Sequence, residues 1–72
     1  GVAYMSKLIN DLVGKQCIIR SEFIFSFAGK TELSCKIIDA DDEWIKICYT
    51  EKKDKQVVKL MRIENIESIE EQ

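Results

Sequence analysis

Apolar and polar residues alternate along much of the chain, which is the pattern of β-strands that bury one face. Where the alternation is interrupted, β-branched and aromatic residues are still frequent, and these residue types favour strands. One such segment, QCIIRSEFIFSF, predicts a long strand that buries its three phenylalanines on one face. The four strands predicted in this way are residues 16–27, 31–39, 43–50 and 56–62.

The two ends of the chain show different patterns. The segment SKLINDLVG (6–14) predicts a short helix, because Ser6 can cap its first turn and Gly14 can end it. The apolar stripe of this helix comprises Leu8, Ile9, Leu12 and Val13. In IENIESIEEQ (63–72), isoleucines at every third position leave two alternatives open, a tight turn into a final strand or a short helix.

These segments predict one all-β domain over residues 6–72, with a short N-terminal helix. Five short strands, separated by turns about every ten residues, are typical of a small, strongly bent antiparallel barrel. Residues 1–5 are expected to be an N-terminal extension or a vector-derived remnant. A chain of 72 residues buries only about 60% of the surface that its unfolded form exposes, so pairing between copies is expected.

Charge is unevenly distributed along the chain, although the net charge is only −2. Residues 39–43 carry four acids, residues 50–62 carry five bases and two acids, and residues 64–71 carry four acids. The whole surface therefore offers no broad attraction for nucleic acid or for an anionic membrane. A local contact with phosphate groups at the basic segment stays open.

The cysteines indicate neither a disulfide framework nor a metal site. Cys17, Cys35 and Cys48 form no C-x-x-C pair, and the chain has no histidine to complete a ligand set. All three lie in apolar segments, so we expect buried thiols, a reducing cytoplasmic setting and no cofactor.

The acidic segment 39–43 is the one candidate for a metal or catalytic site. Asp39, Asp41 and Glu43 occupy positions 1, 3 and 5 of a calcium loop, but Trp44 and Thr50 stand where the loop needs glycine and glutamate. Solvated carboxylates at a hairpin tip have no environment that separates their pKa values, so catalysis is not expected. We therefore predict a hairpin turn, no metal site and no enzymatic activity.

The motifs LSCKIIDADDEWIKI and VVKLMRIENIESIE, which follow a short helix, resemble those of the Sm-like fold, which includes the Hfq-type RNA chaperones. The resemblance covers residues 6–71 in outline. Asp39 matches the aspartate that ends the second strand of the family, and Arg62 matches the arginine of its second motif. Ile63 replaces the glycine of that motif, and Glu43 falls where the family places a base-contacting asparagine, which disfavours RNA.

The resemblance implies self-assembly and RNA as the partners to consider, with no small-molecule substrate and no membrane. The possible contacts to RNA or to a partner are Asp39, Trp44, Arg62, Asn65, Lys52 and Lys53. Of these, Arg62, Asn65 and the two lysines would contact RNA mainly through its phosphates. In the family, the neighbouring subunit pairs with the strand edge that here comprises Val57, Lys59, Met61 and Ile63. The alternative is a protein-interaction or scaffolding module that uses this edge and the surface of Trp44, which could instead cover one end of the barrel.

Overall fold

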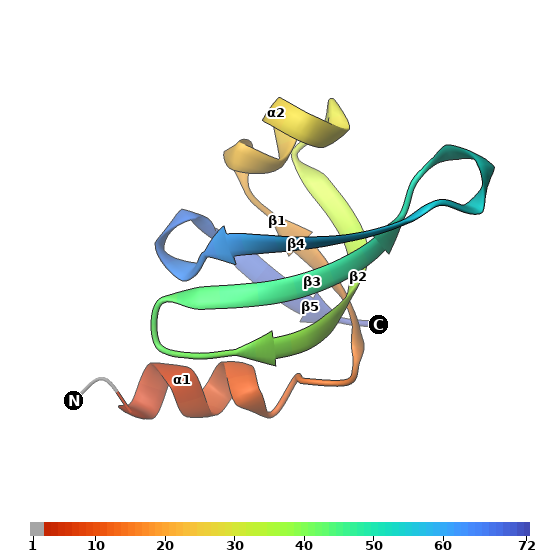
Figure 1. Cartoon of the computed structure of the whole chain (residues 1–72). Helices are drawn as coiled ribbons and strands as arrows, with labels where there is room; N and C mark the ends of the chain where they lie inside the picture. Colours follow the sequence, from red (N-terminus) through yellow and green to blue (C-terminus); the bar gives the residue numbers. More distant parts are fainter. Residues whose placement is uncertain (1–2) are drawn as a thin grey trace.

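The computed structural model describes residues 3–72, including the side chains of residues 7–72. It is mostly sheet, with a short helix at the N-terminal end (Figure 1). In chain order the elements are α1 (Ala3–Asn10), β1 (Gln16–Arg20), η1 (Glu22–Ile24), α2 (Phe25–Ala28), β2 (Glu32–Ala40), β3 (Trp44–Thr50), η2 (Lys52–Asp54), β4 (Gln56–Arg62), η3 (Ile63–Asn65) and β5 (Ser68–Glu71), where η marks a 3-10 turn.

The five strands form one antiparallel sheet in the order β4-β3-β2-β1-β5. The sheet curves, so that β1 and β5 cross behind β3 and β4 in the view of Figure 1. The predicted number and direction of the strands are confirmed. Within residues 3–72, however, no backbone pairing joins β4 to β5, so the sheet stays open between these two edges.

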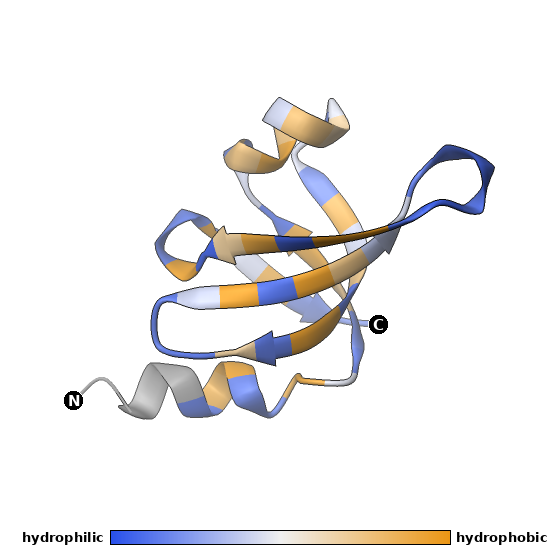
Figure 2. Cartoon of the chain, viewed as in Figure 1, coloured by the Kyte–Doolittle hydropathy of each residue, from blue (hydrophilic) through white to orange (hydrophobic). Residues whose placement is uncertain are grey.

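The core lies on the concave face of the sheet. β3 alternates throughout between buried and more exposed positions, and β2 does so from Leu33 to Ile38, where a shift in the pairing register interrupts the pattern. Their hydropathy alternates in largely the same way (Figure 2). Such alternation buries one face of a strand because successive side chains point to opposite sides. The buried apolar residues are Cys17, Ile19, Ile24, Leu33, Cys35, Ile37, Ile45, Ile47, Tyr49 and Met61.

The helix α1 packs against this core through Ile9, and the following turn adds Leu12 and Val13. The predicted helix over 6–14 is displaced, since α1 begins at Ala3 and Ser6 lies inside it rather than at its N-cap. Gly14 has the left-handed conformation that was predicted, with φ of 88°. Its N–H donates to the Ile37 carbonyl at 2.7 Å, which ties the end of the helical segment to β2.

The largest difference from the sequence prediction is at FIFSF, which is helical rather than extended. β1 ends at Arg20, and the next residue, Ser21, begins the turn η1. The Ser21 hydroxyl accepts a hydrogen bond from the Phe23 N–H at 3.1 Å and donates one to the Asn65 carbonyl at 2.5 Å. Ser21 is fully buried, so these two bonds satisfy its hydroxyl and bend the chain out of the strand.

The change from strand to helix alters which apolar residues of FIFSF are buried. Ile24 enters the core, whereas Phe23 and Phe25 are exposed. Phe27 alone of the three phenylalanines packs against the core, and its ring lies 5.8 Å from the Tyr49 ring. The prediction that all three phenylalanines share one buried strand face is therefore wrong, because a helical turn brings residues three and four apart together.

Two of the three cysteines are buried as predicted. Cys17 and Cys35 are direct partners across β1 and β2, and burial raises the pKa of the Cys35 thiol to about 12. Cys48 is half-buried on β3, where its thiol donates to the Gln56 side-chain oxygen at 3.0 Å. At the C-terminal end, η3 and β5 confirm the tight turn into a final strand.

We expect Ser21→Ala to lower the free energy of unfolding by about 1–2 kcal/mol, because it removes a cap and the buried hydroxyl that donates to the Asn65 carbonyl. Urea denaturation, followed by circular dichroism, measures this change. Ser68→Ala is the control, because that exposed hydroxyl makes no hydrogen bond in the described part of the chain, and it should stay within about 0.5 kcal/mol of the parent protein. Equal stability of the two variants would contradict the role given to Ser21.

Candidate functional site

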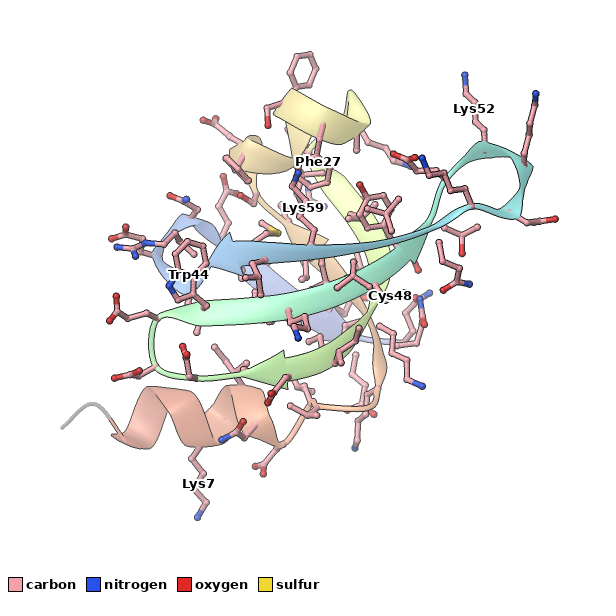
Figure 3. The ribbon with its side chains drawn as sticks, viewed as in Figure 1. Lys7, Phe27, Trp44, Cys48, Lys52 and Lys59 are labelled. Atoms are coloured by element: carbon pink, nitrogen blue, oxygen red, sulfur yellow. The ribbon has the colours of Figure 1, made fainter. Side chains whose placement is uncertain are left out.

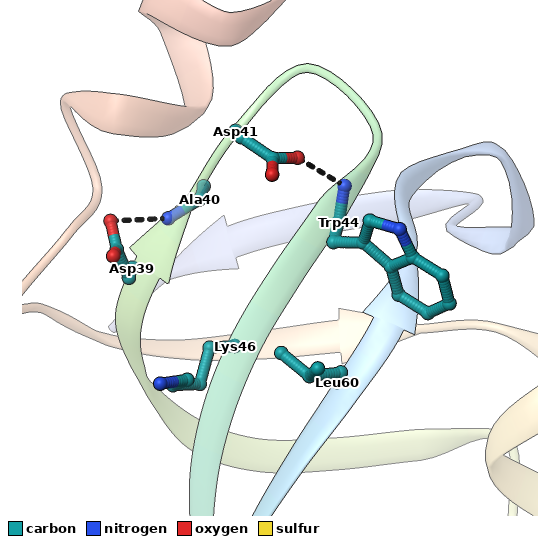
Figure 4. Close-up of a pocket in the computed structure, with 6 residues that line it drawn as sticks. All are labelled: Asp39, Ala40, Asp41, Trp44, Lys46 and Leu60. Carbon is teal, nitrogen blue, oxygen red and sulfur yellow. Dashed lines mark hydrogen bonds between the residues drawn. The ribbon is translucent and has the colours of Figure 1, made fainter.

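The acidic segment forms the turn between β2 and β3, as predicted. The Asp41 carboxylate accepts hydrogen bonds from the N–H groups of Trp44 at 2.7 Å and of Glu43 at 2.8 Å (Figure 4). These two bonds, the one from Trp44 first, hold the pKa of Asp41 below its ordinary value of 3.8. Asp39 accepts from the Ala40 N–H at 2.9 Å. Both carboxylates therefore serve the turn itself.

Trp44 begins β3 and points to the outer, convex face of the sheet. Its side chain is 39% exposed, and the Arg62 guanidinium lies 5.1 Å from its ring. The two residues are direct partners across β3 and β4, which places the cation over the ring. Trp44 also forms one wall of a shallow pocket of about 250 Å³ (Figure 4). The lining residues are Asp39, Ala40, Asp41, Trp44, Lys46 and Leu60.

Arg62 is engaged by two carboxylates. Its guanidinium lies 3.4 Å from Glu43 and 3.4 Å from Glu64. Exposed ion pairs of this kind contribute little to stability, but two neighbouring acids weaken any contact of Arg62 with a phosphate group. Asn65 lies in η3 close to Arg62 in the chain, and its carbonyl is held by the Ser21 hydroxyl.

The structure does not bring the four candidate RNA contacts together. Arg62 and Asn65 lie at the end of the β3–β4 hairpin that carries Trp44. Lys52 and Lys53 lie in η2, at the opposite tip of the same hairpin (Figure 3). Since β4 spans seven residues at about 3.3 Å each, the two groups are roughly 20 Å apart.

Three of the residues predicted to form a subunit edge lie on β4, which pairs only with β3 in the described part of the chain. Met61 is buried and Val57 and Lys59 are half-buried on the inner face, while Ile63 follows in η3. The edge therefore offers a partner its backbone groups rather than these side chains.

A cluster that sequence reasoning missed lies on the outer face of the hairpin. Val58 is 59% exposed and Leu60 is 52% exposed, and together with Trp44 they form what we call the outer patch. Trp44 lies on β3, and Val58 and Leu60 lie on the neighbouring strand β4. The sequence indicates only that Val58 and Leu60 share one face of the strand, and the burial of Met61 on the other face shows that theirs is the outer one.

A second pocket, which we call the lysine pocket, lies between α2 and the far end of β3. It has a volume of about 480 Å³ and is lined by Phe27, Ala28, Lys30, Leu33, Tyr49, Thr50, Glu51 and Lys52. Beside it, the Lys59 ammonium sits 4.1 Å from the centre of the Phe27 ring (Figure 3). Burial, and then the Glu51 carboxylate, raise the pKa of Tyr49, so its hydroxyl stays a neutral donor. The sequence could not indicate this pocket while FIFSF was expected to be extended.

Comparison with known proteins yields no family model that matches the chain, and no significantly similar curated protein or solved structure. Across residues 3–72, no helix has the length and apolar character needed to cross a membrane. In the same residues, no group of three histidine, cysteine, aspartate or glutamate side chains could hold a metal ion. The function must therefore be argued from the surfaces described above.

We expect Asp41→Asn to be less stable than the parent protein at neutral pH, because an amide oxygen is a weaker acceptor than a carboxylate. The folded pKa of Asp41 lies below its unfolded value near 3.8, so its contribution is present above that pH and is lost as the pH falls through the folded pKa. The stability difference should therefore shrink below about pH 4, as measured by urea denaturation across a pH series. Asp42→Asn is the control, and a difference that stays constant down to pH 2 would contradict the role given to Asp41.

Proposed function

We propose that this chain is a non-enzymatic binding module that works by associating with other copies of itself. The observation that carries the proposal is the outer patch, where Trp44, Val58 and Leu60 are exposed beside the free edge of β4. Exposed apolar side chains gathered on one face are typical of interaction sites. Tryptophan in particular often dominates the binding energy of an interface.

The size and topology of the chain support association. Ten buried apolar residues form a small core, and binding between folded copies stabilises the folded state by mass action. The edge of β4 presents unpaired backbone groups, which is where strands of separate chains pair. Together with the resemblance of its motifs, these features lead us to propose that the chain is a member of the Sm-like small barrels, in which the sheet would be closed between subunits. Its free thiols favour a reducing, cytoplasmic setting.

We expect the mass of the protein in solution to rise above 8.3 kDa with concentration, as measured by sedimentation velocity. The double variant Val58→Thr with Leu60→Thr should weaken association roughly tenfold or more, because it removes apolar contact area, while threonine, being β-branched, still favours the strand. Leu8→Gln is the matched control, since Leu8 is exposed on α1, outside the outer patch. A parent protein that stays at 8.3 kDa up to millimolar concentration would refute the proposal.

Single-stranded RNA is the second candidate partner. The observation that favours it is the hairpin tip, where Lys52, Lys53 and Lys55 form no ion pair within the described residues. Free ammonium groups on an exposed tip can contact phosphates without reading sequence. The acids Glu51 and Asp54 stand among them, so such binding would be weak and sensitive to salt.

We expect a fluorescent oligouridine to bind at low salt in the micromolar range, as measured by anisotropy. Lys52→Gln with Lys53→Gln should weaken binding about tenfold, whereas Arg62→Gln should change it less, because Arg62 is already paired with two carboxylates. The order of these two effects distinguishes the hairpin tip from the site implied by the Sm-like resemblance. Absence of binding in the micromolar range would remove RNA as a candidate.

A further inference from the structure

The lysine pocket has the composition of a site for an anionic group with an apolar anchor. Lys30 and Lys52 line it and Lys59 lies beside it, against the single carboxylate of Glu51. None of the three lysines forms an ion pair within residues 7–72. The apolar part of the lining is Phe27, Ala28 and Leu33.

Tyr49 supplies an independent sign that the pocket takes a ligand. It is only 7% exposed and lines the pocket, yet its hydroxyl has no hydrogen-bond partner among the described side chains and backbone groups. A phenolic hydroxyl can both donate and accept a hydrogen bond, and one that lines a pocket without a protein partner is free to bind a group that enters it. An acceptor oxygen brought in by a ligand would satisfy it.

The shape of the pocket does not suit a stacked nucleobase. The Lys59 ammonium sits over the Phe27 ring, and the rings of Tyr49 and Phe23 pack against Phe27 at 5.8 Å and 5.9 Å, so Phe27 is already engaged and is a poor platform for a base. What the pocket does offer is ammonium donors around an apolar floor. This combination fits a polypeptide segment in which carboxylates flank an exposed aromatic or aliphatic side chain.

One such segment is present on the chain itself. At the turn between β2 and β3, the exposed Trp44 directly follows three acids, Asp41, Asp42 and Glu43. Asp42 is exposed and makes no ion pair or side-chain hydrogen bond within the described residues, so its carboxylate is available to a partner. We call this segment, residues 41–44, the acidic tip.

We infer that the lysine pocket of one copy binds the acidic tip of a second copy, with Trp44 as the apolar anchor and Asp42 facing the lysines. This inference rests on the proposed self-association and names the surfaces that meet. The contact cannot form within one chain. Trp44 and Thr50 are the two ends of β3, roughly 20 Å apart, so the acidic tip and the lysine pocket face different neighbours.

The contact is head-to-tail, because each copy uses one surface as donor and a different surface as acceptor. Interfaces of this kind extend from copy to copy, and they produce either a closed ring or an open chain.

Because ion pairs contribute, association should weaken as salt is raised to 1 M, where charges are screened within about 3 Å. The outer patch residue Leu60 lines the same shallow pocket as Trp44, so the apolar contact is continuous with it.

Two complementary variants test the inference. The tip variant carries Asp42→Asn with Trp44→Ala, and the pocket variant carries Lys30→Glu with Lys52→Glu. Each alone should lose self-association by roughly tenfold or more. Mixed in equal amounts, the two should form a complex of one copy of each. The tip variant supplies the intact pocket and the pocket variant supplies the intact acidic tip, so the pair has no further surface through which to grow. Sedimentation velocity resolves these species.

Tryptophan fluorescence provides a second readout, because Trp44 is the only tryptophan in the chain. In the parent protein its emission should shift to shorter wavelength as concentration rises and the ring leaves water. The pocket variant keeps Trp44 and changes only exposed lysines, so it should stay folded and lose this shift. The fluorescence comparison needs only the parent protein and the pocket variant, so it tests the inference even if the tip variant does not fold.

The outcomes separate the inference from the proposed function. If the parent protein associates and both variants associate as strongly, the head-to-tail contact is wrong while self-association stands. The same holds if association is lost only with Val58→Thr and Leu60→Thr, which would assign the contact to the outer patch alone. A parent protein that is monomeric at all concentrations would overturn both.

Discussion

The two candidate surfaces both depend on one buried hydroxyl group. Ser21 accepts a hydrogen bond from the backbone of η1 and donates one to the backbone of η3, which lies 44 residues further along the chain. The first bond turns the chain into α2, so that Phe27 comes to lie over Tyr49 and completes the lysine pocket. The second anchors η3, which directly follows Arg62 at the end of the hairpin that carries Trp44. A small polar core group thus organises surfaces at both ends of the hairpin.

The strands that were predictable are those in which local preference and burial agree. β2 and β3 alternate with period two because one face is in the core and the other in water. In FIFSF, local preference and burial do not agree, and the reason is physical. Strand preference in phenylalanine and isoleucine reflects packing on a sheet surface, and at Ser21 a local side-chain hydrogen bond competes with strand pairing. The interruption of the parity by Ser21 was the available signal.

The candidate surfaces were predictable to different degrees. The acidic turn follows from aspartate chemistry at a hairpin, and parity alone places Trp44 on the outer face with Lys46. The lysine pocket draws its residues from α2, β2 and β3, so its assembly depends on tertiary contacts that no short segment encodes. Proximity in sequence was also misleading, because Lys52 and Arg62 lie at opposite ends of one extended hairpin.

The pairing of β5 with β1 also constrains the order in which the chain can complete its sheet during synthesis. β1 leaves the ribosome well before β5, yet its outer edge is covered only by residues 68–71, and the Gln72 N–H donates to the Gln16 carbonyl at 3.0 Å. Until that segment emerges, β1 presents bare backbone groups to other nascent chains. Contacts between distant parts of a sequence form slowly, so this exposed interval is long relative to hairpin formation. The edge of β1 is therefore completed late, by a strand that lies about fifty residues further along the chain.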